Sequence, residues 1–179
     1  PPPPPPPGSA PHAPKPLWQK EFDLRLTLLS ALFWFALDQI SKWIVLYQMD
    51  LLTIGEMEVL PPLLNFRMGW NTGVNFGLLA NDANATRWLL VALAFVVSAW
   101  ILWWSKRMQK RISMISAGLI VGGAIANAFD RVIYGAVADF LNTTCCGFEN
   151  PYAFNIADIG IFIGALGLLI FADEKNITP

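Results

Sequence analysis

The chain has 179 residues, of which 55% are hydrophobic and only 14% are charged, and its mean hydropathy is +0.47. This composition does not suit the surface of a water-soluble domain and favours a protein embedded in a lipid bilayer. The formal net charge of -1 excludes the strongly basic surface that nucleic-acid binding requires, so no nucleic-acid partner is expected.

The reactive side chains exclude several further classes of site. The single histidine, His12, lies in a proline-rich tail, which rules out a Ser-His-Asp triad, a Cys-His dyad and a histidine-ligated zinc site. We therefore expect neither a metal nor a cofactor. Cys145 and Cys146 are adjacent and too few for a disulfide framework, so two reduced thiols are expected.

The N-terminal residues 1–16 are dominated by proline, with glycine, serine and alanine. Such a segment favours an extended, solvated chain and cannot build a core. We expect a disordered tail over 1–16 and a single membrane-embedded domain over 17–179.

Four segments are apolar enough to cross a bilayer as helices, which takes roughly 20 residues each. The segments 88–105 and 112–129 contain no charged residue, and 154–172 contains only Asp158. The segment 24–48 is long enough, although Asp38 and Lys42 lie toward its far end. The predicted fold is thus mainly α and polytopic, with spans at 24–48, 88–105, 112–134 and 154–172.

The basic residues predict the orientation of these spans. Cytoplasmic loops are enriched in Lys and Arg, and here the basic residues gather in the N-terminal flank and in the connection between the second and third spans: Lys15, Lys20, Arg25, Lys106, Arg107, Lys110 and Arg111. The segments 49–87 and 135–153, with two and no basic residues, are then expected outside. Both termini are expected in the cytoplasm.

The outer segment 56–79 has a different pattern. It mixes β-forming residues with Pro61-Pro62 and three glycines, and it shows no helical period. This composition predicts a few short strands lying on the outer surface of the membrane.

Polar and ionisable residues gather in the predicted spans and at their junctions. An ionisable group inside a membrane is expensive unless it is paired or hydrated. Eight such residues are predicted in the outward halves of their helices: Asp38, Lys42, Asn127, Asp130, Arg131, Asp139, Asn155 and Asp158. One buried Asn or one Asp-Arg pair is commonly interhelical glue, but eight at one side favour a functional site.

The spacing of these residues indicates which of them meet. Asn127, Asp130 and Arg131 share one face of a helix, and the charge of Arg131 beside Asp130 fits an ion-paired structural role for that aspartate. Asp139 and Asp158 border the same outer loop, so their carboxylates can approach each other near the membrane surface. Two close carboxylates tend to share one proton, so that one can activate a water while the other polarises a carbonyl.

This pairing predicts the chemistry of an aspartic protease, which needs neither histidine nor metal. A Ser-Lys hydrolase with Lys42 as base is a poorer alternative, because Ser30 and Ser41 are the only serines near the first span. A small transporter would also place Asp, Asn and Arg in its spans, but its polar path has to reach both sides of the membrane. The polar residues of this chain stop halfway.

At these residues the chain resembles the lipoprotein signal peptidases, also called signal peptidase II, which are aspartic proteases of the bacterial inner membrane. The resemblance covers nearly all of 24–172. It depends on four ordered motifs: DQISKW at 38–43, NTGVNFG at 71–77, GGAIANAFDRVIYGAVADF at 122–140 and FNIAD at 154–158. The chain departs from the family pattern at Asn75, where many members have alanine, and at the Cys145-Cys146 pair.

The resemblance implies a fold of four transmembrane helices with a small extracytoplasmic β-sheet and a mobile outer helix. It assigns three sets of residues: the catalytic dyad Asp139 and Asp158; the substrate-binding Asn71, Asn127, Arg131 and Asn155; and the supporting Asp38, Lys42 and Asp130. No metal or cofactor takes part in the implied reaction.

The implied substrates are prolipoproteins that carry diacylglycerol on a cysteine, and the cut falls just before that cysteine on the periplasmic side. The other implied partners are membrane lipid and a globomycin-type cyclic peptide inhibitor, and a monomer is expected. A noncatalytic assembly factor that only binds lipoproteins is the remaining alternative, which binding without cleavage would reveal.

Overall fold

The structure is a computed structural model that describes residues 17–73, 83–144 and 150–171. The predicted disordered tail, Asn75 and the two cysteines lie outside these residues. The elements in chain order are α1 (Leu17–Trp43), the π-helix η1 (Ile44–Gln48), α2 (Leu51–Ile54), β1 (Glu56–Leu60), β2 (Leu64–Asn71), α3 (Ala83–Ser105), α4 (Arg111–Tyr134), β3 (Val137–Thr143) and α5 (Ile156–Phe171).

The mainly helical fold class is confirmed. Three helical segments of the described chain are long and apolar enough to cross a membrane, namely Leu24–Gln48, Asn84–Ser105 and Arg111–Tyr134. The fourth predicted span corresponds to α5, which is apolar but has 16 residues. At 1.5 Å per residue it is about 24 Å long.

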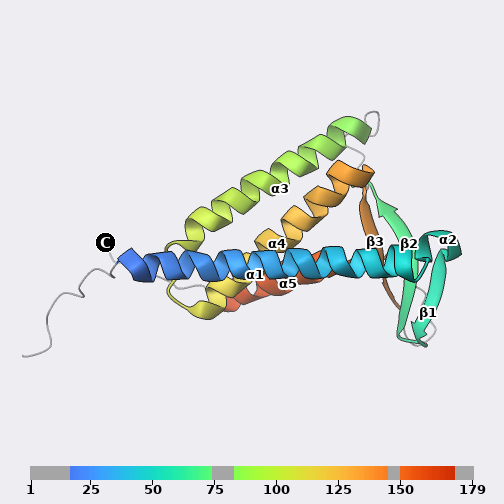
Figure 1. The fold of residues 1–179 in the computed structure, drawn as a ribbon, viewed down its shortest axis with the longest axis horizontal. Helices are drawn as coiled ribbons and strands as arrows, with labels where there is room; N and C mark the ends of the chain where they lie inside the picture. The colour runs from blue at the N-terminus through green and yellow to red at the C-terminus, as the bar shows by residue number, and fades with distance from the viewer. Residues whose placement is uncertain (1–16, 74–82, 145–149, 172–179) are drawn as a thin grey trace, which may run out of the picture.

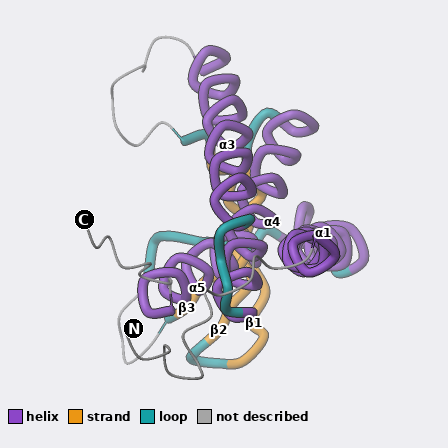
Figure 2. The backbone as a smooth tube through the Cα atoms, turned by 90° about the vertical axis from the view of Figure 1, so that its left-hand side faces the viewer, coloured by secondary structure: helices purple, strands orange, loops and turns teal. Residues whose placement is uncertain are grey.

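The long helix α4 is the centre of the bundle. It packs against α1, α3 and α5, and Figure 2 shows it between these three helices. Glycines permit the closest approaches: a Cβ atom at Gly122 would collide with the carbonyl of Ala31 on α1, and one at Gly123 with the carbonyl of Ala157 on α5. Small residues at helix contacts are the usual means of tight packing in membranes, where burial of apolar surface drives association little.

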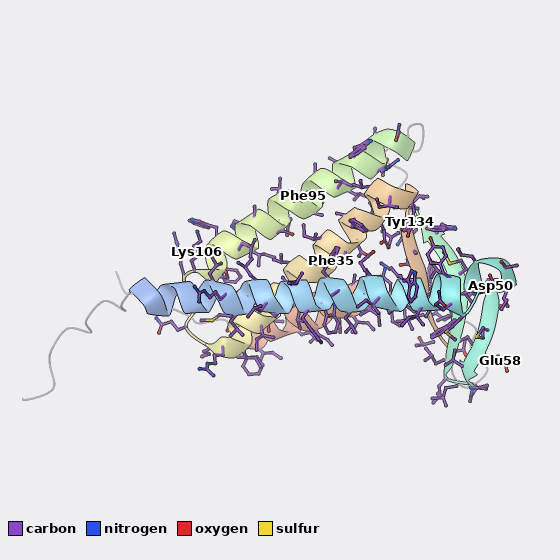
Figure 3. The ribbon with its side chains drawn as sticks, in the orientation of Figure 1. Phe35, Asp50, Glu58, Phe95, Lys106 and Tyr134 are labelled. Atoms are coloured by element: carbon purple, nitrogen blue, oxygen red, sulfur yellow. The ribbon has the colours of Figure 1, made fainter. Side chains whose placement is uncertain are left out.

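A three-stranded antiparallel sheet in the order β1-β2-β3 lies at one end of the bundle (Figure 1). Its apolar side packs on a small core that contains Leu46, Leu51 and Phe140. In Figure 3, Asp50 and Glu58 mark this end, and Lys106 lies at the opposite end of the bundle. The short strands predicted within 56–79 are confirmed for β1 and β2, while 74–82 lies outside the described residues.

The structure corrects the predicted position of Asp139, which was expected in the outward half of a helix. The helix α4 ends at Tyr134, and Gly135 follows with φ 85°, in the left-handed region that glycine adopts without steric cost. Its amide donates to the carbonyl of Arg131 (3.1 Å), and the chain then turns into β3. Asp139 therefore lies on a strand, and Asn155 precedes α5 instead of lying within it.

Candidate active site

Strand β3 brings Asp139 to the first turn of α5. On one side Asp139 is in register with Gly69 of β2. Farther along β3, Leu141 exchanges two backbone hydrogen bonds with Phe154, at 2.8 and 2.9 Å. Phe154 is followed directly by Asn155 and α5, so this pairing places Asp139 beside the start of that helix.

Asn155 and Asp158 cap the start of α5 reciprocally. The amide of Asp158 donates to Oδ1 of Asn155 (2.9 Å), and the amide of Asn155 donates to Oδ2 of Asp158 (3.2 Å). This arrangement is a capping box, which satisfies two amides at the helix start. The carboxylate of Asp158 is thereby fixed in the first turn of α5.

Two asparagine amides join the predicted catalytic carboxylates. Nδ2 of the buried Asn155 donates to Oδ1 of Asp139 (2.6 Å) and to Oδ1 of Asn127 (3.1 Å). Nδ2 of Asn127 in turn donates to Oδ1 of Asp158 (2.8 Å). The structure thus brings together both members of the predicted dyad and two of the predicted substrate-binding residues.

Asn71, at the end of β2, completes the surroundings of Asp139. Its Nδ2 donates to Oδ2 of Asp139 (3.1 Å), and its Oδ1 accepts from the amide of Gly73 (3.0 Å). A cavity of about 190 Å³ opens beside these groups, lined by residues 69–73 and 151–153 together with Asp139. Asp139 is buried but lines this cavity, and Asp158, which is half-buried, is not among the lining residues.

The environment of Asp139 favours its protonated form. Burial, and next the negative charge of Asp158, raise the pKa of Asp139 from 3.8 to about 6, although the hydrogen bonds from Asn71 and Asn155 oppose this shift. Asp139 therefore holds a proton over a pH range in which an ordinary aspartate is ionised. This behaviour is what a dyad that shares one proton requires.

Arg131 lies on α4, one helical turn after Asn127. Its Nη1 donates to the carbonyl of Asn127 (3.2 Å), and its charge acts on Asp139 and Asp158. Its Nε is buried and has no hydrogen-bond partner in the part of the chain that the structure describes. A buried donor without a partner is uncommon.

The predicted supporting residues form a separate, closed cluster. Nζ of Lys42 lies 2.7 Å from Oδ2 of Asp38 and 2.6 Å from Oδ2 of Asp130. The side chain of Lys42 is 5% exposed and both aspartates are 0% exposed. The ion-paired role expected for Asp130 is therefore present, but its partner is Lys42 of α1 and not the neighbouring Arg131.

Two further residues of α1 that were not among the predicted site residues make hydrogen bonds in this region. Gln39 donates through Nε2 to Asp38 (3.1 Å) and Asp130 (2.9 Å), and Trp34 donates through Nε1 to the carbonyl of Ile156 (3.0 Å). The only available signal was that both lie within a few residues of Asp38. No group of His, Cys, Asp and Glu suitable for holding a metal is found among the residues with described positions.

Comparison with known proteins identifies the family of this chain. Residues 30–172 match the family model described as signal peptidase (SPase) II. The chain belongs to the signal peptidase II family. It is therefore an aspartic peptidase and a bacterial membrane protein, and the predicted family and enzyme class are confirmed.

Individual relatives cover most of the chain. A lipoprotein signal peptidase of Methylobacterium sp. (strain 4-46) is 42% identical over 147 residues, which cover 82% of this chain and 88% of that protein. One from Pseudomonas aeruginosa is 36% identical over 149 residues, which cover 79% and 85%.

Two solved structures, each described as a bacterial membrane enzyme, share the fold. One superposes with a TM-score of 0.69 at 26% identity and covers 83% of this chain and 93% of its own. The other has a TM-score of 0.66 at 28% identity, with 80% and 85% covered.

Proposed function

We propose that this protein removes the signal peptide from diacylglyceryl-modified prolipoproteins and that Asp139 and Asp158 are its catalytic dyad. The observation that carries the proposal is a pair of carboxylates bridged by asparagine amides, one of which, Asp139, lines a cavity at the sheet end of the bundle. The names of the relatives support the same class of substrate.

Each aspartate has its own role in the proposed reaction. Asp158, whose oxygens accept from the amide of Asn155 and from Nδ2 of Asn127, takes a proton from the attacking water, while protonated Asp139 donates a hydrogen bond to the scissile carbonyl. The resulting tetrahedral intermediate is stabilised by that hydrogen bond. It collapses when the proton passes from Asp158 to the leaving amine nitrogen. No step requires a metal.

The remaining site residues hold the substrate backbone and the dyad. Asn71, Asn127 and Asn155 present amide groups around the two carboxylates. The unpaired Nε of Arg131 is suited to a backbone carbonyl of the substrate. In this scheme the substrate does not contact the supporting residues, which stabilise the site from inside the bundle: Asp38, Lys42 and Asp130.

The lipid part of the substrate is expected to remain in the bilayer. Trp70 and Tyr152, both at the cavity wall, are 46% and 69% exposed. The ring of Trp70 also contacts Tyr134, at 5.7 Å between centroids. Aromatic residues prefer the membrane interface, so these rings are suited to guide the diacylglyceryl group as the substrate enters sideways.

The proposal includes location and partners. The protein lies in the bacterial inner membrane with both termini in the cytoplasm and the dyad on the periplasmic side, because basic residues such as Lys106 lie at the end opposite Glu58 (Figure 3). It acts as a monomer, binds membrane lipid, and is inhibited by a globomycin-type cyclic peptide.

A cleavage assay on a synthetic prolipoprotein peptide tests the proposal. Mass spectrometry should detect a single cut immediately before the cysteine when that cysteine carries diacylglycerol, and little or no cut in the same peptide without lipid. Equal cleavage of both peptides, or cleavage elsewhere, would contradict the assigned substrate. Binding without any cleavage would indicate an assembly factor.

A further inference from the structure

We propose that α1 positions both catalytic aspartates through the backbone of the residue before each of them, Ala157 and Ala138, and that Trp34 and Gln39 are positioning residues in this arrangement. The proposal rests on the proposed function, since it takes Asp139 and Asp158 as the dyad. Neither Trp34 nor Gln39 is hydrogen-bonded to either of these carboxylates.

The first half of this arrangement holds the peptide bond between Ile156 and Ala157, the residue before Asp158. Trp34 donates through Nε1 to the carbonyl of Ile156 (3.0 Å), and Oδ1 of Asp38 accepts from the amide of Ala157 (2.8 Å). These two groups belong to the same peptide bond. Trp34 and Asp38 are four residues apart on α1, which corresponds to about 6 Å along the helix. The bond is therefore held at both of its ends by one helix.

The ring of Trp34 packs closely against α5. The indole ring lies where a side chain at Gly160 of α5 would be, and a Cβ atom there would collide with the ring. The ring thus sets the distance between α1 and the first turns of α5. Its N–H group restricts sliding of α5 along the axis of that helix. Asp158 lies in the first of these turns.

The second half holds the backbone of Ala138, the residue before Asp139. The amide of Ala138 donates to Oδ2 of the buried Asp130 (3.2 Å). Asp130 is tied to α1 twice, by Lys42 at Oδ2 (2.6 Å) and by Gln39 at Oδ1 (2.9 Å).

The two halves are joined through the side chains of α1. Lys42 and Gln39 each contact both Asp38 and Asp130, at distances of 2.6 to 3.1 Å. Asp38 holds the amide before Asp158, and Asp130 holds the amide before Asp139. A displacement of Asp38 is therefore transmitted to Asp130, and the reverse. The separation between Asp139 and Asp158 is in this way set by α1.

This positioning matters because a displacement of about 1 Å in catalytic geometry can cost roughly a hundredfold in rate. Trp34→Phe keeps an aromatic ring but removes the N–H donor. Gln39→Met keeps the length of the side chain but removes its amide. Each variant loosens one support and leaves the dyad, the asparagine bridge and the cavity lining unchanged.

The experiment measures kcat and KM for the lipidated peptide with the full chain in nanodiscs. We expect kcat to fall roughly ten- to hundredfold in Trp34→Phe and Gln39→Met, with KM within about twofold of wild type. Trp43→Phe and Gln48→Met are matched controls at exposed positions of the same helical segment, and they should retain the wild-type kcat.

The outcomes separate this proposal from the proposed function. Asp139→Asn and Asp158→Asn are measured alongside, and wild-type turnover in either folded variant would refute the dyad itself. If both are inactive while Trp34→Phe and Gln39→Met keep the wild-type kcat, the positioning role is wrong and the function stands. A lower yield of folded protein with normal kcat in the folded fraction would show a purely structural role and overturn the proposal.

Discussion

Two pairs of aspartates lie near the end of the bundle that carries the sheet, and they are held by opposite means. Asp38 and Asp130 share the ammonium group of Lys42, at 2.7 and 2.6 Å, and both are fully buried. Asp139 and Asp158 are joined by the neutral amides of Asn127 and Asn155, and Asp139 lines a cavity. We call the first pair closed, because it is fully buried and held by a positive charge. We call the second pair open, because it is bridged by neutral groups beside a cavity.

The difference indicates how one fold keeps four close carboxylates in distinct roles. A cation that contacts two buried carboxylates holds both of them in place, which suits a fixed support. An amide stabilises a carboxylate without supplying a full charge, so the pair remains free to share a proton. The choice between Lys and Asn as the bridging residue therefore separates a structural pair from a proposed catalytic one.

Removal of the bridging cation should have the largest effect on folding. Lys42→Met leaves Asp38 and Asp130 buried without a positive partner, so we expect a loss of about 3–5 kcal/mol of stability, measured by thermal unfolding in detergent. The control Lys106→Met changes an exposed lysine and should have little effect. An unchanged melting temperature in Lys42→Met would show that the charged pairing does not support the fold.

Introduction of a cation into the open pair should convert it into a second closed pair. Asn127→Lys places an ammonium group beside Asp158, which favours the ionised form of both catalytic carboxylates. Because the reaction needs one of them protonated, cleavage should fall by about 10²–10⁴-fold while the protein remains folded. Asn127→Ala removes only the amide and should lose less activity. Activity in Asn127→Lys equal to that of Asn127→Ala would contradict the comparison.

The pH dependence of kcat/KM should depend on the protonation of Asp139, with a smaller effect than the substitutions above. Asp139 has a pKa of about 6, so kcat/KM should decline as the pH rises through this value and the proton is lost. The hydrogen bond from Asn71 lowers that pKa, so Asn71→Ala should move the decline to higher pH, by up to about one unit. Thr72→Ala, in the same cavity wall, should leave it in place. A decline that moves to lower pH would reverse the assigned role of Asn71.

Much of this arrangement could be predicted from the sequence. The long apolar runs locate the spans, and the spacing of Asn127, Asp130 and Arg131 places them on one helix face. The pairing of Asp139 with Asp158 follows from their position at the two ends of one outer loop. The roles of the asparagines and of Lys42 depended on the family resemblance and not on spacing.

The rest could not be predicted because it depends on contacts between distant segments. Strand β3 follows α4 after only two residues, so the strand position of Asp139 could not be inferred from the apolar run that precedes it. The ion pair of Asp130 with Lys42 joins α4 to α1, whereas the local sequence offered Arg131. The contact of Trp34 with Ile156 spans 122 positions, and no local pattern indicates it.

The most direct test of the dyad is cleavage of the lipidated peptide by Asp139→Asn and Asp158→Asn, with folding checked by thermal unfolding. Each variant keeps the size of the side chain and removes the ability to carry the shared proton. We expect turnover to fall by at least about 10³-fold in both, with melting temperatures near that of the wild type. Near wild-type turnover in either folded variant would contradict the assignment of Asp139 and Asp158 as the catalytic pair.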